Sequence, residues 1–491
     1  MAILVVVVLA VPAVTALGFL APAWRRGMVW AGAASAAASL AVAIALAVAV
    51  VRGGPVTALG GLVRADALSA FLLVVISAVA VPATLATPGH FAAERAAGRA
   101  TARTAARHGL LVHLFLAAMT LAVLAANLGL LWVSVEATTV VTAFLVGQSR
   151  TRTAVEAAWK YVVICSAGLA LALLGTLLLG YAAGHAGGSL DLAGLAAGAD
   201  GLDSGVTRIA VTLLVLGFGA KAGLAPLHAW LPDAHSQAPA PVSALMSGVL
   251  LAVAFYAVLR VKVVSDAALG TGFARGLLVV MALASLFVAA TLLLAQRDYK
   301  RMLAYSSIEH LGLVSFGAAV GGPVATAAVL VHVLGHGLVK AVLFLGAGRV
   351  AQGTGTSRID RVRGLAARGP VLAGSLGAGV LALAGMPPFS LFASELGLAR
   401  AGFAGGLGWA TALVLVLVLV VAAALAGHTT RMLLGEPPGG PGAARAPVTV
   451  PRATRVALAV PLVAAAVLGL WTGPLESLLH AAAASAGGGG W

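Results

Sequence analysis

The chain has 491 residues, of which 61% are hydrophobic and only 9% are charged, and its mean hydropathy is +1.06. Soluble chains carry about 25% charged residues, so this composition excludes a soluble or disordered protein and predicts one that is solvated by a lipid bilayer. The net charge of +15 does not indicate nucleic-acid binding, because the basic residues stand in short segments between apolar runs without interleaved aromatics.

The apolar runs predict an all-α polytopic membrane protein of about fourteen transmembrane helices, since about 20 apolar residues span the hydrocarbon core. The expected spans are 2–22, 28–51, 67–88, 109–127, 128–148, 158–182, 207–226, 241–261, 276–295, 302–320, 324–348, 370–402 with an internal break, 408–434 and 454–473. We divide the chain into an N-terminal three-helix segment (1–108), a central domain (109–435), a Pro/Gly-rich cytoplasmic loop (436–453) and a C-terminal helix with its tail (454–491).

The basic residues predict the orientation. Most of the 30 lysines and arginines follow odd-numbered spans, while a few, including Arg260, fall in the even-numbered loops. Cytoplasmic loops are enriched in these residues, so we expect a multi-pass protein of the cell membrane with both termini outside. Arg25 and Arg26 follow the first apolar run, which favours a membrane helix over a signal peptide.

The sequence offers no site for a redox or nucleotide cofactor. Its one cysteine, Cys165, cannot hold an iron–sulfur cluster alone, and the glycines at 487–490 are low-complexity rather than a phosphate loop. We therefore expect no cofactor, no metal and no catalytic residue in this chain.

Ionisable residues within the apolar runs are the candidate functional residues, because charge at membrane depth is costly. Four lie well inside such runs: Glu136, Lys221, Lys340 and Glu395. For Glu136 and Lys221 we favour a functional coupled ion pair over a static one, because a buried pair is a poor source of stability. The possible additional participants are His228, His235, Glu309, His310 and Tyr256.

Two spans are broken by glycine and proline, at 219–241 and at 385–395. In a membrane, broken helices are tolerated where they face protein or water, and matching breaks in two halves indicate inverted repeats. The interval from Glu136 to Glu309 is one residue shorter than that from Lys221 to Glu395. We therefore predict two inverted five-helix repeats, 109–262 and 273–435.

His332, His336 and Lys340 recur every four residues and so share one stripe of a helix. Such a stripe of titratable groups suits a proton relay. A metal site is the alternative, but no third ligand is evident and Lys340 would repel a cation. For Glu309 and His310, a functional role and simple pairing with the loop charges Arg297, Lys300 and Arg301 remain open, and His228 and His235 either line an aqueous vestibule or cap helix ends.

The segments that carry these residues resemble the antiporter-like membrane subunits of complex I, energy-converting hydrogenases and Mrp-type cation/proton antiporters. The resemblance rests on four stretches: Lys221-Ala-Gly-Leu-Ala-Pro-Leu-His-Ala-Trp-Leu-Pro-Asp-Ala-His235, Asp298-Tyr-Lys-Arg-Met-Leu-Ala-Tyr-Ser-Ser-Ile-Glu-His310, His332-Val-Leu-Gly-His-Gly-Leu-Val-Lys340, and Gly385-Met-Pro to Glu395. It covers about residues 110–435. Trp132-Val-Ser-Val-Glu136 and Ser307-Ile-Glu-His310 look most like the F-type membrane component of hydrogenase-4 complexes.

The resemblance implies that Glu136 and Lys221 form a coupled pair, that His332, His336 and Lys340 carry protons through the centre, and that Glu395 gates the exit. Protons would move from the cytoplasm to the outside, driven by redox chemistry in partner membrane and peripheral subunits. Complex I relatives commonly carry a lysine midway along the eighth helix, where this chain has Ala252. Two alternatives stay open here: water, with help from Tyr256, bridges that position, or this subunit pumps differently. We also expect no long lateral helix after the fourteenth span.

The sequence thus predicts a proton-translocating subunit of a multi-subunit redox complex, hydrogenase-4-like or similar to NADH:quinone oxidoreductase. Two alternatives remain open. One is a subunit of a sodium/proton antiporter complex without electron transfer, and the other is a membrane anchor that conducts nothing.

Overall fold

Long apolar runs become helices because a helix satisfies its backbone hydrogen bonds internally, which lipid cannot do. The computed structural model describes residues 1–21, 29–435 and 447–487. The helices are α1 (Ala2–Gly18), α2 (Ala31–Gly53), α3 (Ala67–Ala96), α4 (Ala102–Leu124), α5 (Leu128–Val146), α6 (Arg152–His185), α7 (Leu192–Ala197), α8 (Ser204–Lys221), α9 (Trp230–Gln237), α10 (Ala240–Leu245), α11 (Leu251–Leu269), α12 (Thr271–Leu294), α13 (Tyr299–Val320), α14 (Gly322–Thr354), α15 (Leu365–Arg368), α16 (Pro370–Leu383), α17 (Ser390–Ala404), α18 (Gly408–Leu434), α19 (Arg452–Leu470) and α20 (Glu476–Ala486).

Eleven helical stretches in the described residues are long and apolar enough to cross a membrane, and α1 and α16 are shorter apolar helices. The all-α polytopic fold predicted from the sequence is confirmed. The count of fourteen stays a prediction, because the eleven candidate spans do not include α1, α13, α16 or α17. Arg25, Arg26 and residues 436–446 of the expected cytoplasmic loop lie outside the described residues, and α20 is a short helix that the apolar pattern did not predict.

Polar residues mark where several helices begin. Asp66, Asn127 and Asp298 accept backbone N–H groups at the starts of α3, α5 and α13. These N–H groups have no partner within the helix, so the side-chain oxygens satisfy them. Before α3, the short strands β1 (Val56–Ala58) and β2 (Val63–Ala65) form an antiparallel hairpin with Val56 opposite Ala65.

The two halves of the central domain have the same order of helices. In the first, α5 is followed by the 34-residue α6 and by the broken pair α8 and α9. In the second, α13 is followed by the 33-residue α14 and by the broken pair α16 and α17. Long α6 contacts α9, and long α14 likewise contacts α17. This order agrees with the predicted repeats, and both breaks lie where the sequence places them.

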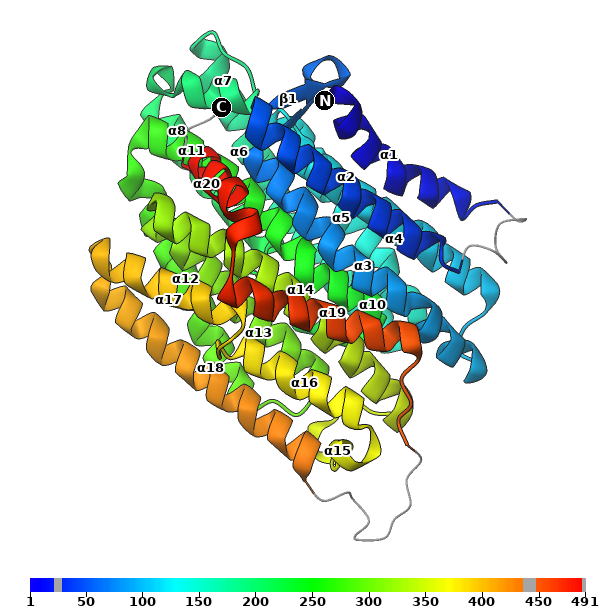
Figure 1. Cartoon of the computed structure of the whole chain (residues 1–491). Coiled ribbons are helices and arrows are strands. Elements are labelled where there is room, and N and C mark those ends of the chain that lie inside the picture. Colours follow the sequence, from blue (N-terminus) through cyan, green and yellow to red (C-terminus); the bar gives the residue numbers. More distant parts are fainter. Residues whose placement is uncertain (22–28, 436–446, 488–491) are drawn as a thin grey trace.

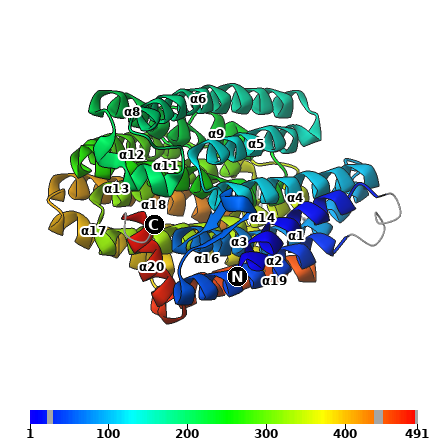
Figure 2. The same ribbon diagram turned by 90° about the horizontal axis from the view of Figure 1, so that it is seen from above.

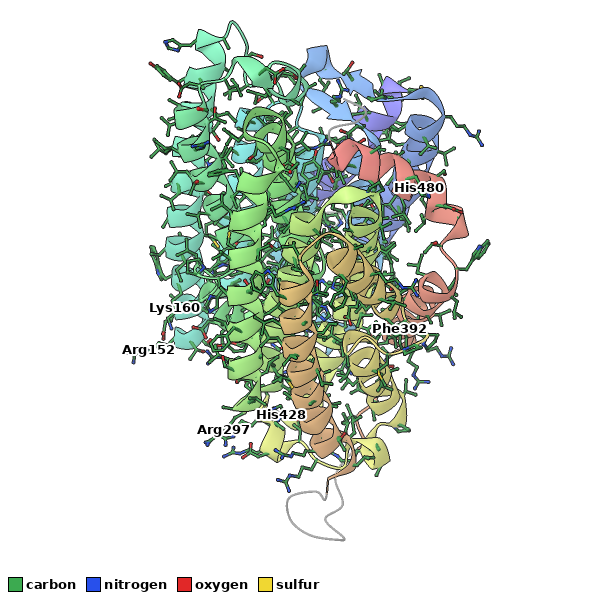
Figure 3. The ribbon with its side chains drawn as sticks, turned by 90° about the vertical axis from the view of Figure 1, so that its left-hand side faces the viewer. Arg152, Lys160, Arg297, Phe392, His428 and His480 are labelled. Atoms are coloured by element: carbon green, nitrogen blue, oxygen red, sulfur yellow. The ribbon has the colours of Figure 1, made fainter. Side chains whose placement is uncertain are left out.

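The helices lie side by side, with the hairpin β1–β2, α7 and α20 at one end of the bundle and α15 at the other (Figure 1). Viewed from above, α6 and α8 form one flank, α14 is central, and α2 and α19 lie on the opposite flank (Figure 2). Arg152, Lys160 and Arg297, from loops and helix ends predicted to be cytoplasmic, lie towards the same lower end, whereas His480 lies towards the other end (Figure 3).

The two halves meet closely where α10–α11 crosses α14. Residues Met246–Leu250 between α10 and α11 form a π-helical turn. A Cβ on Gly248 would lie 3.0 Å from the Gly337 carbonyl oxygen, and one on Gly337 would lie 2.7 Å from the Gly248 oxygen. Only glycine leaves room for this backbone contact. π-Turns inside helices occur frequently at functional sites, and this one lies between the two broken helices in the chain.

Candidate functional site

Lys221 is fully buried at the last residue of α8, where the helix breaks. Its ammonium donates hydrogen bonds to Thr139 Oγ1 of α5, at 2.8 Å, and to the Tyr161 hydroxyl of α6. It also lies 4.6 Å from the centre of the Tyr161 ring. Its position at a helix C-terminus is favourable for a cation, because the last carbonyl groups carry partial negative charge.

Glu136 lies one turn before Thr139 on α5 and is half-buried. One carboxylate oxygen accepts a hydrogen bond from Ser166 Oγ of α6, at 3.2 Å, and the other has no partner among the described residues. The predicted pair therefore belongs to one cluster of α5, α6 and α8. Its charges do not form an ion pair within 4.0 Å, because Lys221 bonds to hydroxyl groups instead.

Two contacts join the halves near the π-turn. Ser247 of the π-turn hydrogen-bonds to Ser307 of α13, with 2.8 Å between the oxygens. His235 of α9 is fully buried and stacks on Phe344 of α14, with ring centres 4.9 Å apart. His235 thus lies at the junction of the halves rather than in a vestibule. His228 lies half-exposed between α8 and α9.

Lys340 lies at this junction on the second half's side and is fully buried. Its ammonium donates to the Leu303 carbonyl oxygen at 2.7 Å and to Ser306 Oγ at 2.5 Å, both on α13. The hydroxyl groups of Ser247 and Ser307 and the imidazole of His235 lie at this junction. Ala252 contributes no polar atom.

Glu309 and His310 are buried among the helices and do not pair with loop charges. Nε2 of His310 lies 3.3 Å from a Glu309 oxygen, and its Nδ1 lies 3.0 Å from Nε2 of His332 on α14. Nδ1 of His332 lies 2.9 Å from Ser394 Oγ on α17. Of the loop cations, Arg301 pairs with Asp233 and Lys300 donates to backbone oxygens of residues 236 and 238. The interpretation as simple pairing with loop charges is therefore wrong.

The hydrogen bonds of Ser394 determine which nitrogen donates and which accepts in this series of side chains. Ser394 donates its hydroxyl proton to the Leu391 carbonyl oxygen, so its oxygen accepts from Nδ1 of His332. Nε2 of a neutral His332 is then an acceptor, and Nδ1 of His310 donates to it. Nε2 of His310 is left facing Glu309. The hydrogen bonds thus run from His310 through His332 to Ser394, while Nε2 of His310 and the Glu309 oxygen lie close without a hydrogen bond between them.

His336 extends the cluster along the stripe, its ring centre 5.0 Å from that of His310. The sequence predicted the shared face of His332, His336 and Lys340. It also named His310 as a possible participant, but it could not predict that His310 approaches His332 from another helix.

Glu395 lies in the second turn of α17, after the break, and is half-buried. A Cβ on Gly385, which has a φ of +64°, would lie 2.2 Å from a Glu395 oxygen, so glycine is needed both for the backbone turn and for the carboxylate. The other oxygen, Oε1, has no partner among the described residues. Ligand atoms of His310, His332 and Glu395 all lie within 4.8 Å of one another, close enough to hold a metal ion.

Arg260 and Tyr256 form a separate buried cluster that the sequence pattern did not indicate. Arg260, assigned above to an outer loop, is 2% exposed within α11, and its guanidinium lies 2.6 Å from the Asp66 carboxylate. The Tyr256 hydroxyl donates to the Val123 carbonyl oxygen at 2.9 Å, and Arg260 lies 4.8 Å from its ring centre. Tyr256 is thus committed to this cluster, and the expectation that it helps to bridge the halves is not supported by its contacts.

Residues 125–421 match the model of the family described as NADH:quinone oxidoreductase/Mrp antiporter, transmembrane. The chain belongs to this family. The match includes every candidate residue named above and extends from just before α5 into α18.

Curated relatives point to the same group. The chain is 42% identical over 290 residues to the "Hydrogenase-4 component F homolog" of Methylacidiphilum infernorum, covering 58% of this chain and 61% of that protein. It is 34% identical over 345 residues to "Hydrogenase-4 component B" of Escherichia coli, covering 68% and 49%. The matches thus span less than two thirds of each relative's length.

The fold agrees over nearly the whole chain with chains of three solved complexes. The archaeal membrane-bound sulfane sulfur reductase gives a TM-score of 0.86 at 25% identity, covering 98% of this chain and 97% of that one. Respiratory complex I from Thermus thermophilus gives 0.80 at 25% identity, covering 98% and 99%. The Mrp complex of Dietzia sp. gives 0.85 at 24% identity, covering 99% and 98%. This chain is therefore an integral multi-pass membrane protein of the antiporter-like type.

Proposed function

We propose that this chain is a proton-translocating subunit of a multi-subunit redox complex, moving protons from the cytoplasm to the outside. The observation that carries the proposal is the buried series His310–His332–Ser394, whose two hydrogen bonds are 3.0 and 2.9 Å long, with a Glu309 oxygen 3.3 Å from Nε2 of His310. A chain of this kind is costly in a membrane protein and is suited to passing a proton between imidazole nitrogens.

The cluster around Lys221 supplies the first half of the path. A lysine that bonds only to neutral hydroxyl groups can release and regain a proton without breaking an ion pair. Changes in the distance between Glu136 and Lys221 would then alter the proton affinity of the ammonium. The contacts of Ser247 and His235 across the junction support continuity towards Lys340.

Partners, membrane and orientation belong to the same proposal. The relatives named above are components of hydrogenase-4 and respiratory complexes, and we propose redox subunits as partners here. The basic residues favour a cell-membrane location with both termini outside. A single-cysteine reporter at position 2 or 480, labelled in intact cells with a membrane-impermeant reagent, tests the orientation: labelling without permeabilisation supports it, and labelling only after permeabilisation overturns it.

The function itself is tested with the purified parent complex in proteoliposomes that contain a pH-sensitive dye. Lys221→Ala and Glu395→Gln are compared with the unaltered complex, with assembly and electron transfer measured in parallel. Loss of proton movement in an intact complex supports the proposal. Unchanged proton movement in both variants would overturn it in favour of a structural anchor.

A sodium/proton antiporter subunit is the second candidate, because the family description joins both classes. Sodium flux and proton flux measured in the same proteoliposomes separate them. Obligate exchange of the two ions without an electron donor would favour the antiporter.

A further inference from the structure

We propose that His310, His332 and Glu395 form a binding site for a divalent transition-metal ion, with Zn²⁺ as the best-fitting probe. One ligand atom of each residue lies within 4.8 Å of the others, from three different helices, and Nδ1 of His310 lies 3.0 Å from Nε2 of His332. Two imidazoles and one carboxylate are a donor set that suits Zn²⁺ and disfavours Mg²⁺ and Ca²⁺, which prefer oxygen.

Oxygen atoms lie close to the second ring nitrogen of each histidine. A histidine bound to a metal usually donates its second ring N–H to a carboxylate, a carbonyl or another oxygen, which fixes the ring. For His332 that partner is Ser394 Oγ at 2.9 Å from Nδ1. For His310 the Glu309 carboxylate lies 3.3 Å from Nε2, but the two atoms do not form a hydrogen bond. The second nitrogen of His332 is therefore fixed by an oxygen, while that of His310 has only a carboxylate nearby.

The geometry requires only a small contraction. Around a tetrahedral Zn²⁺ with metal–ligand distances of about 2.0–2.2 Å, neighbouring ligand atoms lie about 3.3 Å apart. The two imidazole nitrogens are already 3.0 Å apart. The Glu395 carboxylate has to approach by roughly 1–1.5 Å to reach that spacing, and its Oε1 has no competing partner among the described residues.

The structure removes one objection from the sequence and reduces the other. The missing third ligand comes from outside the His332–His336 helix, as His310 of α13 and Glu395 of α17. Lys340 lies eight residues along α14 from His332, about 12 Å of helix rise, and its ammonium is held by hydrogen bonds to Leu303 and Ser306.

Charge and access also favour the site. Zn²⁺ with the ionised carboxylates of Glu395 and Glu309 gives no net charge, which a low-dielectric interior favours. Binding displaces the proton between the two imidazoles and any proton on the carboxylates, so the affinity must fall as the pH falls. Glu395 is half-buried, and Phe392, one turn earlier on α17, is 39% exposed and lies at the outer face of the bundle (Figure 3), so this side of the cluster is the one nearest the surface.

Occupation of the site would hold both imidazoles of the relay and stop proton passage, a consequence that rests on the proposed function. Metal binding itself does not depend on it.

The test titrates Zn²⁺ into the purified full-length chain against a competing chromophoric chelator, followed by X-ray absorption at the zinc edge. We expect one tight site with two imidazole ligands. His310→Gln, His332→Gln and Glu395→Gln should each weaken it at least 100-fold, and Ser394→Ala about 10-fold. His332→Cys, which keeps a zinc ligand, should restore tight binding with a sulfur signal in the spectrum.

The matched controls are His235→Gln, a fully buried histidine outside the group, and His480→Gln, an exposed one. Thermal unfolding without metal verifies that each variant folds. Absence of a saturable site in the unaltered chain, retention of the site in all three ligand variants, or equal loss in the controls would each overturn the proposal. Proton flux is recorded separately, in the parent complex and without added Zn²⁺: absence of flux from the metal-free complex would overturn the proposed function and leave the metal site standing.

Discussion

At the scale of single residues, the hydroxyl groups around Lys221 indicate how this lysine can change its protonation state. Lys221 is held by Thr139 and Tyr161 rather than by Glu136. Hydroxyl groups accept hydrogen bonds from an ammonium ion and can also donate to the lone pair of a neutral amine, so they suit both protonation states. A carboxylate in direct contact would favour the charged state alone.

Tyr161→Phe tests this arrangement. It removes one of the two hydrogen-bond partners of a buried ammonium, an effect of about 1–3 kcal/mol, so we expect proton movement to slow roughly tenfold while electron transfer and assembly persist. The measurement is dye-reported proton flux in proteoliposomes. Tyr181→Phe, on the exposed face of the same helix, should leave the flux unchanged. Equal rates in the two variants would show that the Tyr161 hydroxyl is not part of the path.

At the scale of helices, the close crossing of α10–α11 with α14 depends on two glycines. Gly337 lies between His336 and Leu338, and a Cβ there would meet both the Gly248 carbonyl oxygen and Val79 at less than 3.0 Å. Backbone atoms cannot yield as a flexible side chain can. A methyl group must therefore separate the two helices and shift His336 from His310.

Gly337→Ala should lower stability by about 1–3 kcal/mol, the usual result of overpacking, and reduce proton flux in the complex that still assembles. Thermal unfolding of the purified chain measures the first effect. Gly427→Ala is the matched control, because it lies in the long helix α18 with no atom within 4 Å of the added Cβ. An unfolding temperature for Gly337→Ala at or above that of the control would contradict the role given to this crossing.

How far the sequence predicts these elements depends on whether the signal is local. Apolar length, the Gly/Pro breaks and the four-residue spacing of His332, His336 and Lys340 are local, and the structure places all of them as expected. The approach of His310 to His332 joins positions 22 residues apart, and that of Lys221 to Tyr161 joins positions 60 apart. Such contacts are set by helix packing, which no periodicity encodes. Neutral hydroxyls such as Ser394 carry no charge to distinguish them in an apolar run.

At the scale of the whole molecule, the buried Asp66–Arg260 pair joins α3 to α11, two helices far apart in the sequence. Asp66 begins α3 and also caps it, while Arg260 belongs to α11. Sequence position is misleading here: Arg260 lies near the end of its apolar run and resembles an orientation signal, although its side chain is only 3% exposed. The partner in a distant helix decides its role.

Because both charges are buried, removing Asp66 takes from Arg260 the carboxylate that lies 2.6 Å away, and breaking a buried pair typically costs about 3–5 kcal/mol. Asp66→Asn should therefore lower the unfolding temperature markedly and reduce the amount of chain recovered in the membrane. Asp360→Asn is the matched control. Asp360 pairs with Arg358 at the exposed surface, so its loss should leave the unfolding temperature unchanged. The double variant Asp66→Asn, Arg260→Met should regain much of the lost stability, because no uncompensated charge remains. If the double variant is as unstable as Asp66→Asn alone, the defect does not arise from the buried charge of Arg260, and the ion pair is not what holds α3 to α11.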